Sequence, residues 1–370
     1  MDSDPNQRPI HVAICIDSSV YSRYRAILRH LCVGLSDLIA GIRIVTPTRE
    51  ATALSLGPVQ AVIHEEIRWP FRKQRTKEVI AKLSAKPPNI IHAMSAGSYA
   101  NSESLANAFD IEIVYQVTAY EDVFALAESQ FTGMKHVICA SEPLREACLS
   151  QCRLSPADVT LVRPGVVCAK EPTCYRVADR VPTILATASF EPDSGVDQLI
   201  RAIALVKGKN QEMLAFLLGG GPEEDQLRQI ATRLNLNSSV IFAQPEGDIL
   251  QAMVGADIFV IPSAEKSISA RSLQAMGQGM AVIAVDGGVS DAYIADETAI
   301  VARAATAPDL AAAIERLLID RDFARQIATN AIAHMKDRHT MSRMADQTAE
   351  IYHKLALRKT TLKMPKSSKS

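Results

Sequence analysis

The stretch IPSAEKSISARSLQAMGQGMAVIAVDGGVSDAYI (residues 261–294) contains the clearest strand–helix–strand pattern in the chain. An apolar strand enters the stretch and is predicted to end in a short polar loop, and a helix is predicted to start near Ser269. That helix closes at Gly277 or Gly279, and a second apolar strand follows. The loop Lys266–Ser269 therefore lies at the end of a strand and leads directly into a helix. Backbone N–H groups and the helix dipole at such a position can bind a phosphate.

Short, β-branched apolar runs alternate with amphipathic stretches through the rest of the chain. The predicted strands of the first half are HVAICI (11–16), IRIVTP (42–47), AVIHE (61–65), NIIHAM (89–94), IEIVYQV (111–117), HVICAS (136–141) and VTLVRP (159–164). Those of the second half are TILATA (183–188), MLAFLLG (213–219), VIFAQ (240–244), DIFVIP (257–262) and MAVIAVD (280–286). Helices are predicted over 22–40 and 98–109, and from near Gly195, Glu223, Asp248, Ser269 and Pro308. This alternation is typical of parallel α/β sheets that are covered on both faces.

The chain is long enough for two domains, since its 370 residues exceed the usual size of one. The alternating pattern stops over 167–181, which holds prolines and mixed charges and is predicted to be an interdomain linker. The first domain is expected to span residues 1–166 and the second residues 182–340. Both are predicted to be Rossmann-like parallel-sheet domains facing a cleft, and ligands of such sheets bind at the carboxyl ends of the strands.

The end of the chain holds one more amphipathic pattern, which predicts a helix over 341–357. Because its apolar face needs a partner, we expect it to cross back onto the first domain and complete it. The last residues, 358–370, contain five cations and no acid. They are predicted to form a basic disordered tail, with attachment to an anionic membrane surface as the alternative.

Composition excludes some classes of protein. Lys+Arg 40 against Asp+Glu 41 gives a net charge of −1, which offers no reason to expect nucleic acid as a partner. The first residues lack the basic-then-apolar order of a secretory signal, and no apolar run approaches the length of a membrane span. The seven cysteines form no CxxC pair and no zinc-type spacing. We therefore expect a cytoplasmic protein with reduced thiols and no bound metal or cofactor.

A glycine-rich turn follows the strand over 213–219. The segment LLGGGP (217–222) runs from an apolar strand through three glycines to a proline at the first turn of a helix. Glycines let the backbone approach a ligand closely, and the helix N-terminus offers free N–H groups to an anion. A tight strand–helix turn is the structural alternative. We expect Gly219–Gly221 and Ser267–Ala270 to flank one anion-binding pocket in the interdomain cleft.

The second half of the chain resembles the nucleotide-sugar domain of glycosyltransferase family 4, whose members are retaining enzymes with the GT-B fold. The segments that carry this resemblance are SGVDQLIRAIALV (194–206), LLGGGPEEDQLRQIATRLNL (217–236), VIFAQPEGDILQAMVGADIFVIPS (240–263), SLQAMGQGMAVIAVDGGVSDAYI (272–294) and DLAAAIERLLID (309–320). Looser matches in the first half are IIHAMSAGSYANSESLANAF, VICASEPLREACLS and VTLVRPGV. The resemblance implies a GT-B fold, with a nucleotide-sugar donor on the second domain and an unknown glycan or lipid acceptor on the first.

The donor site implied by the resemblance departs from the family pattern. Two glutamates of the family fall on Lys266 and Gln274, and the Arg and Lys that clamp the donor diphosphate fall on Ser189 and Ser194. In the first half, Ser18-Ser19 replaces a Gly-Gly pair, and the histidine expected after the strand over 111–117 is absent, with Ala119 or Tyr120 nearby. The donor-binding positions implied are Ser189, Ser194, Gly219, Gly220, Gly221, Lys266, Ser267, Ile268, Ser269, Ala270, Arg271 and Gln274.

These replacements remove groups that would stabilise the departing nucleoside diphosphate, each worth on the order of 3 kcal/mol. Lys266 and Arg271 are candidate substitute cations, and Gln274 could still bind a ribose hydroxyl. Two interpretations of these replacements stay open. Either the chemistry of the donor site has changed, or the site has accumulated neutral substitutions in an inactive protein. The sequence predicts a glycosyltransferase-like protein with weak or lost transfer, and the alternative is a catalytically inactive binding or scaffold protein. An epimerase on the same two-domain plan is less favoured, because the sequence does not place the carboxylates and histidines that such an enzyme would need in the cleft.

Two further groups of residues attract attention. His11, His64, His92 and His136 lie in predicted strands, where a packed, hydrogen-bonded histidine is expected, and His92 is the best placed for a cleft. The segment RWPFRKQRTKEV (68–79) places five cations around Trp69 and Phe71. A solvated helix start is expected there, with contact to an anionic membrane or acceptor as the alternative.

Overall fold

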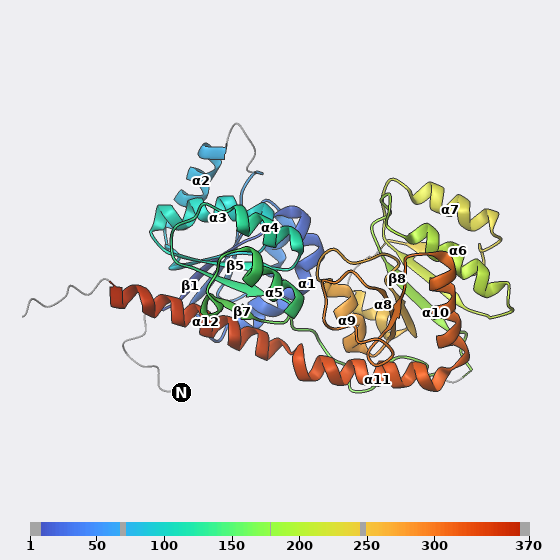
Figure 1. Ribbon diagram of the computed structural model, residues 1–370. Helices are drawn as coiled ribbons and strands as arrows, with labels where there is room; N and C mark the ends of the chain where they lie inside the picture. The colour runs from blue at the N-terminus through green and yellow to red at the C-terminus, as the bar shows by residue number, and fades with distance from the viewer. Residues whose placement is uncertain (1–8, 67–71, 178, 245–248, 363–370) are drawn as a thin grey trace, which may run out of the picture. The chain divides into compact units, whose positions relative to one another are not determined.

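A computed structural model describes residues 9–66, 72–177, 179–244 and 249–362 of the protein. The chain divides into two compact units. The first contains the residues up to Gly165 together with helix α12 (Met341–Leu362), and the second contains Val166–Thr340. Figure 1 shows helices packed around the sheet of each unit. The two units have the GT-B-like architecture of paired parallel α/β sheets.

The first unit is built on a seven-stranded sheet with the order β3-β2-β1-β4-β5-β6-β7. Every neighbouring pair is parallel, and Ile14 of β1 lies opposite Ile44 of β2 and His92 of β4. The strands are β1 (His11–Cys15), β2 (Gly41–Thr46), β3 (Val59–Ile63), β4 (Ile90–Ala93), β5 (Glu112–Val117), β6 (Lys135–Cys139) and β7 (Val159–Leu161). Its other α-helices are α1 (Ser18–Leu35), α2 (Arg72–Ser84), α3 (Ala96–Phe109), α4 (Tyr120–Glu128) and α5 (Glu142–Gln151).

The second unit repeats this plan with a six-stranded parallel sheet in the order β10-β9-β8-β11-β12-β13. The strands are β8 (Thr183–Thr187), β9 (Leu214–Leu218), β10 (Val240–Ala243), β11 (Ile258–Val260), β12 (Ala281–Val285) and β13 (Ile300–Ala302). The helices are α6 (Val196–Lys207), α7 (Glu224–Arg233), α8 (Ile249–Val254), α9 (Ala270–Gln278), α10 (Ala307–Ile319) and α11 (Arg321–Arg338). Apolar side chains of β8, β9, β11 and β12 pack with α6 and α10 in one buried core.

The segment predicted as a linker has no helix or strand in its described residues, and it belongs to the second unit. Cys174 and Tyr175 are buried in that unit's core. The Tyr175 N–H donates to the carboxylate of Asp257 over 2.8 Å, and the Arg180 guanidinium pairs with the same carboxylate at 2.9 Å. These contacts fix the segment against the amino end of β11.

Helix α12 packs on α1 within the first unit. A side chain on Gly34 of α1 would place its Cβ only 2.5 Å from the Cβ of Ala345, so the glycine permits a close approach of the two helices. Buried Tyr352 reaches β4, where its hydroxyl lies 2.6 Å from Nδ1 of His92. His92 is therefore a packed core residue between the sheet and α12. The predicted tail overlaps the last turn of α12, and its residues from 363 on lie outside the described part of the chain.

Burial of His92 predicts that stability depends on pH. Desolvation lowers the pKa of His92 to about 4. The unfolded chain takes up this proton near pH 6.5 and the folded protein only near pH 4, so stability is lost as the pH falls through this window. We expect the His92→Gln variant to lose about 2 kcal/mol less than the wild type between pH 7 and pH 5. Urea unfolding at both pH values measures this, and equal losses in the two proteins would contradict it.

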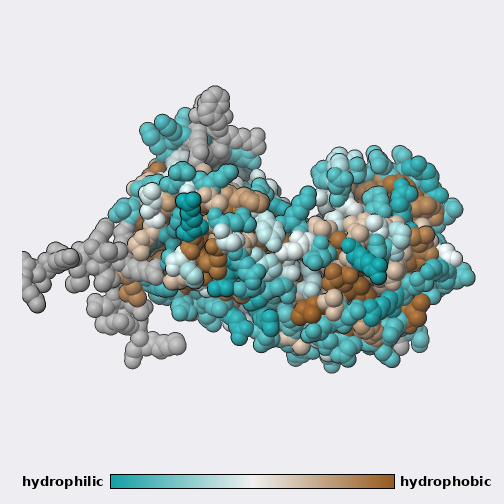
Figure 2. Space-filling view, in the orientation of Figure 1, coloured by the Kyte–Doolittle hydropathy of each residue, from teal (hydrophilic) through white to brown (hydrophobic). Residues whose placement is uncertain are grey.

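Hydrophilic residues cover most of the face shown in Figure 2, with apolar residues scattered among them. Among the described residues, no helix combines the length and the apolar character that a membrane crossing requires. The aromatic residues of the basic segment, Trp69 and Phe71, lie outside the described residues. One cation of that segment, Arg75, pairs with Glu65 and Glu78 on the surface.

Candidate functional site

The second sheet has a topological switch point between β8 and β11, where the strand order reverses. These two strands are hydrogen-bonded neighbours, but the chain leaves β8 toward β9 on one side and leaves β11 toward β12 on the other. Loops that follow such a pair diverge, and ligands of open parallel sheets bind where they diverge, at the carboxyl ends of the strands. The predicted donor residues lie in the loops after β8, β9 and β11 and in the first turns of α9.

The glycine-rich turn after β9 packs directly on the loop after β8. A Cβ on Gly219 would lie 1.9 Å from the carbonyl oxygen of Ala188, and a Cβ on Gly221 would lie 2.5 Å from that of Phe190. The Phe190 N–H donates to the Gly220 carbonyl over 3.0 Å. The glycines are therefore needed for backbone contact between two loops, which accounts for their presence without a ligand. They also hold Ser189 at the carboxyl edge.

Gly195 joins the loop after β8 to the loop after β11. It adopts a left-handed conformation with φ 76° as the N-cap of α6, and a Cβ there would lie 2.3 Å from the carbonyl oxygen of Pro262. Only glycine accepts both this φ and this contact without strain. Ser194 precedes it and Ser263 follows Pro262. The segments Gly219–Gly221 and Ser267–Ala270 thus lie at one edge of the sheet, with the loop after β8 between them.

Helix α9 starts at Ala270, one residue after the start that the sequence predicts near Ser269. The Ser269 hydroxyl accepts the Ser272 N–H over 3.3 Å and caps the helix. Ile268 and Ala270 are buried, so they can offer a ligand only backbone atoms. Lys266 is exposed at the tip of the loop, and Arg271 is half-buried in the first turn. The helix N-terminus and these two cations make this the more positive side of the edge.

Gln274 is not directed to a ligand in this structure. Its side-chain amide donates to the Val167 carbonyl over 2.6 Å, and its oxygen accepts the Val167 N–H at 3.3 Å. Gln278 donates to the same carbonyl over 2.9 Å. The amide of Gln274 thus satisfies a peptide group of the chain segment that enters the second unit. Its assignment to a ribose hydroxyl stays a prediction that would require these two bonds to break.

The structure adds Glu265, which the sequence reasoning did not single out. Its carboxylate accepts hydrogen bonds from the Ser272 hydroxyl at 2.9 Å and from the Tyr293 hydroxyl at 2.5 Å. Burial raises the pKa of Glu265, against the opposite effect of these hydroxyl donors. A Cβ on Gly287 would lie 2.1 Å from the Glu265 carbonyl oxygen, so the loop after β12 packs on the same backbone. Glu265 therefore positions the loop that precedes α9. Its place one residue before Lys266 was the signal in the sequence that could have identified it.

The first unit has its own cavity at the carboxyl edge of its sheet, beside β1. It has a volume of about 210 Å³, and its polar lining includes Asp17, Ser18, His64, Glu66 and Asn101. Ser18, one of the two serines in the place of the family's glycines, donates to Glu66 over 3.3 Å. Burial would raise the pKa of Asp17, but hydrogen bonds from Ser19, Ser95 and the Val20 N–H outweigh it and hold the pKa below its usual value. The lining of the cavity therefore includes the carboxylate of Asp17 with a lowered pKa, and the acidic side chain of Glu66 lies nearby.

The described residues include no cluster of three or more metal-ligating side chains. The seven cysteines, all in the described part of the chain, are free thiols. Three of the four histidines that were weighed as candidates have side-chain partners. Nε2 of His136 lies 2.8 Å from the Thr160 hydroxyl, His64 bonds the Glu65 carbonyl, and His92 bonds Tyr352. Near the start of α9, the candidate site offers backbone N–H groups, serine hydroxyls and the cations Lys266 and Arg271.

The amino-acid sequence is similar to those of known glycosyltransferases. The chain is 31% identical over 188 residues to the D-inositol 3-phosphate glycosyltransferase of Nocardia farcinica, which covers 48% of this chain and 42% of that protein. It is 24% identical to the protein of the same description from Stackebrandtia nassauensis over 298 residues, or 74% of this chain and 65% of that one. The chain thus spans about half to two thirds of the length of these relatives.

Solved structures share the fold across almost the whole chain. A glycosyltransferase from Rickettsia africae has a TM-score of 0.76 at 16% identity, covering 94% of this chain and 99% of that one. Anabaena HepE, solved in complex with UDP and glucose, has a TM-score of 0.74 at 17% identity, covering 94% and 100%. Residues 175–334 match the family described as glycosyl transferases group 1. This segment makes up most of the second unit.

Proposed function

We propose that the protein binds a nucleotide sugar at the carboxyl edge of the second sheet and transfers the sugar, with retention and at a weak rate, to a glycan or lipid acceptor. The observation that carries this proposal is the meeting of the loops after β8, β9 and β11 beside the N-terminus of α9. Backbone N–H groups at such an edge bind phosphates whatever the side chains are. The acceptor is assigned to the first unit, whose cavity at the β1 edge presents Asp17 and Glu66.

The charges of the loop after β8 support the weak rate. Between Ala188 and Gly195 the chain reads ASFEPDSG, with two acids and no base. A donor diphosphate is negatively charged, and this loop would repel it where the family supplies an Arg and a Lys. Charge compensation matters most in the transition state, as the diphosphate departs. Binding should therefore persist better than transfer does.

The engagement of Gln274 favours a second candidate function, that of an inactive binding or scaffold protein. The side chain at this position holds the Val167 peptide, and Lys266 stands where the resemblance implies a glutamate. Neither group offers a carboxylate to the transferred sugar. A protein that retains the fold and the backbone phosphate site could still bind a nucleotide sugar or present the first unit to a partner.

Calorimetry with a panel of UDP-, GDP- and ADP-sugars tests the proposed function. We expect one nucleotide to bind with a Kd in the high micromolar range or weaker, on the order of −5 kcal/mol. The matched nucleoside should bind much more weakly, because the phosphate contacts supply the affinity. Absence of binding by every nucleotide sugar at millimolar concentration would contradict the donor site in both candidate functions.

Lys266 is the cation most exposed to a ligand at this edge, and removing it should weaken diphosphate binding. We expect Lys266→Ala to raise the Kd of the nucleotide sugar by about threefold to tenfold, the effect of one charge-assisted hydrogen bond near solvent. Lys209→Ala is the matched control, because Lys209 lies after α6 at the amino edge and its ammonium forms a surface ion pair with Glu315. Equal effects of the two substitutions would exclude a specific role for Lys266.

A further inference from the structure

A second cavity of the first unit lies at the amino edge of its sheet, at the ends of β1, β2 and β3 opposite the cavity beside Asp17. Its volume is about 140 Å³, enough for several water molecules at ~30 Å³ each. Strand residues His11, Arg43 and Gln60 line it together with Lys86, which lies between α2 and β4. It is thus separate from the carboxyl edge at which the proposed transfer would take place.

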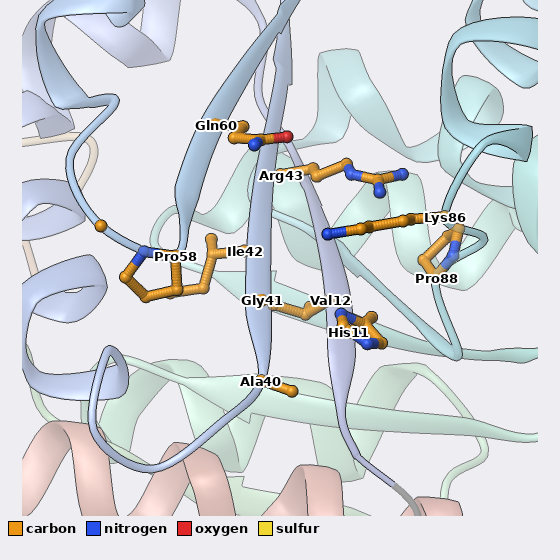
Figure 3. Close-up of a pocket in the computed structure, with 11 residues that line it drawn as sticks. His11, Val12, Ala40, Gly41, Ile42, Arg43, Pro58, Gln60, Lys86 and Pro88 are labelled. Carbon is orange, nitrogen blue, oxygen red and sulfur yellow. The ribbon is translucent and has the colours of Figure 1, made fainter.

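The lining of this cavity is basic. Arg43, Lys86 and His11 come from three different parts of the chain, and Figure 3 shows their side chains grouped in one region, with Lys86 between Arg43 and His11. No aspartate or glutamate is among the residues that line it in the described part of the chain. Two permanent cations side by side without a carboxylate repel one another, so an anion between them would be stabilised.

The structure explains part of this arrangement without a ligand. One nitrogen of Arg43 donates over 3.0 Å to the carbonyl of Leu83, near the C-terminal end of α2. This bond satisfies a helix-end carbonyl and fixes the guanidinium, whose other N–H groups are not used by it. It gives no reason for Lys86 or for the imidazole of His11 to stand beside the same guanidinium.

Local backbone features keep the cavity open. A Cβ on Gly41 would lie 2.8 Å from Nδ1 of His11, so the glycine makes room for the imidazole. Gly57 has φ 58° and nothing within 4 Å of where its Cβ would be, which leaves open space beside Pro58. The backbone N–H of His11 is bonded to Asn89 over 3.0 Å, which fixes the residue at the start of β1.

We propose that this cavity binds a phosphate group, held by Arg43, Lys86 and His11. A guanidinium matches two phosphate oxygens with parallel N–H donors, and the ammonium serves the third as a point charge. The protonation of the His11 imidazole should change when a phosphate binds in the cavity. Burial, with the charges of Arg43 and Lys86, lowers the pKa of His11 in the empty cavity. A bound phosphate opposes those two cations and raises the pKa again.

The phosphate group can belong to a soluble phosphorylated compound or to the headgroup of an anionic lipid. The first probe is inorganic phosphate, titrated into the full-length protein while the His11 imidazole is followed by NMR. The expected result is saturable binding with a Kd of roughly 1 mM or tighter and a rise of the His11 pKa. Vesicles of phosphatidylcholine with and without phosphatidic acid form the second arm. Binding to the phosphatidic acid vesicles that phosphate competes away assigns the lipid source, and phosphate binding without vesicle binding assigns the soluble one.

Substitutions separate a built site from general charge. Lys86 is exposed, so Lys86→Gln should fold normally and is expected to weaken phosphate binding about tenfold. Arg43→Lys keeps the charge but loses the paired donors, and it should also weaken binding. Lys77→Gln is the matched control, since Lys77 is an exposed cation of the same unit that does not line the cavity. Failure of phosphate to bind at ~10 mM, or equal loss in Lys86→Gln and Lys77→Gln, would overturn the proposal.

Discussion

Replacing Ser189 by Arg and Ser194 by Lys is expected to tighten nucleotide-sugar binding by about 100-fold, the largest gain that the structure predicts. Each new cation would meet the donor diphosphate at the carboxyl edge of β8. One decade of affinity corresponds to about 1.4 kcal/mol, close to the lower end of the range for a hydrogen bond to a charged group. Ser189 is exposed and Ser194 is half-buried, so both positions can accept a longer side chain. Calorimetry with the nucleotide that binds the wild type measures the gain.

The control for this double variant adds the same charge elsewhere. Asn237→Lys with Ser238→Arg places two cations before β10, at the amino edge of the same sheet. General attraction of an anionic ligand would strengthen binding in both double variants alike. That outcome, or no gain in the first variant, would contradict a diphosphate site beside the loop after β8.

Restoring the two glutamates is a separate experiment, and the structure changes what it should do. Lys266→Glu alters an exposed loop residue and is expected to be tolerated. Gln274→Glu removes the amide donor to the Val167 carbonyl and sets a carboxylate against it, at a cost of about 1–3 kcal/mol. The four substitutions together should therefore tighten donor binding and raise transfer, but in a less stable second unit. The double variant with Ser189→Arg and Ser194→Lys, which keeps both Lys266 and Gln274, shows how much of the gain comes from the added cations.

The second large effect concerns Gly195, where the loops after β8 and β11 meet. We expect Gly195→Ala to destabilise the second unit by about 3 kcal/mol and to remove nucleotide binding. The φ of 76° costs an alanine about 1 kcal/mol or more, and its Cβ would overlap the Pro262 carbonyl at 2.3 Å. Urea unfolding followed by circular dichroism measures the loss of stability.

Gly208→Ala is the matched control, because Gly208 has φ −60° at the end of α6 and a Cβ there would meet only ordinary contacts of 3.4 Å. That substitution should be neutral or slightly stabilising. Should Gly195→Ala be as stable as Gly208→Ala, the close contact between the two loops does not organise this edge of the sheet.

The parallel-sheet architecture could be predicted because it follows from local sequence patterns, namely apolar strand runs and helix-capping residues. The apolar run DIFVIP is the buried strand β11, and Ser269 caps the helix that follows it, within one residue of the predicted start. Strand β13 was not predicted, because Ile300–Ala302 is a three-residue edge strand that lacks a long apolar run. Helix α11 was also not predicted, since only Asp320 separates it from α10 and the two helical patterns run together.

The directions of single side chains could not be predicted in the same way. Gln274 could serve a ribose hydroxyl or a peptide group equally well by its chemistry. The choice depends on the path of Val167, more than a hundred residues earlier, which brings a peptide within 2.6 Å of the amide. His92 was the best-placed histidine for a cleft, yet Tyr352 from the far end of the chain holds it in the core. Long-range packing, rather than local pattern, decides both cases.

The central claim is that the protein still binds a nucleotide-sugar donor but transfers the sugar slowly. The rate at which nucleoside diphosphate is released from the bound donor tests this claim most directly. The rate should be measured at saturating donor, with water and then a panel of glycan and lipid acceptors to take the sugar. The wild type is compared with the variant that carries Ser189→Arg, Ser194→Lys and Lys266→Glu. We expect the wild type to release nucleotide at least 100-fold more slowly than roughly 1–10 per second, the rate of an ordinary enzyme, and the variant to be faster. A wild-type rate of roughly 1–10 per second would contradict the claim.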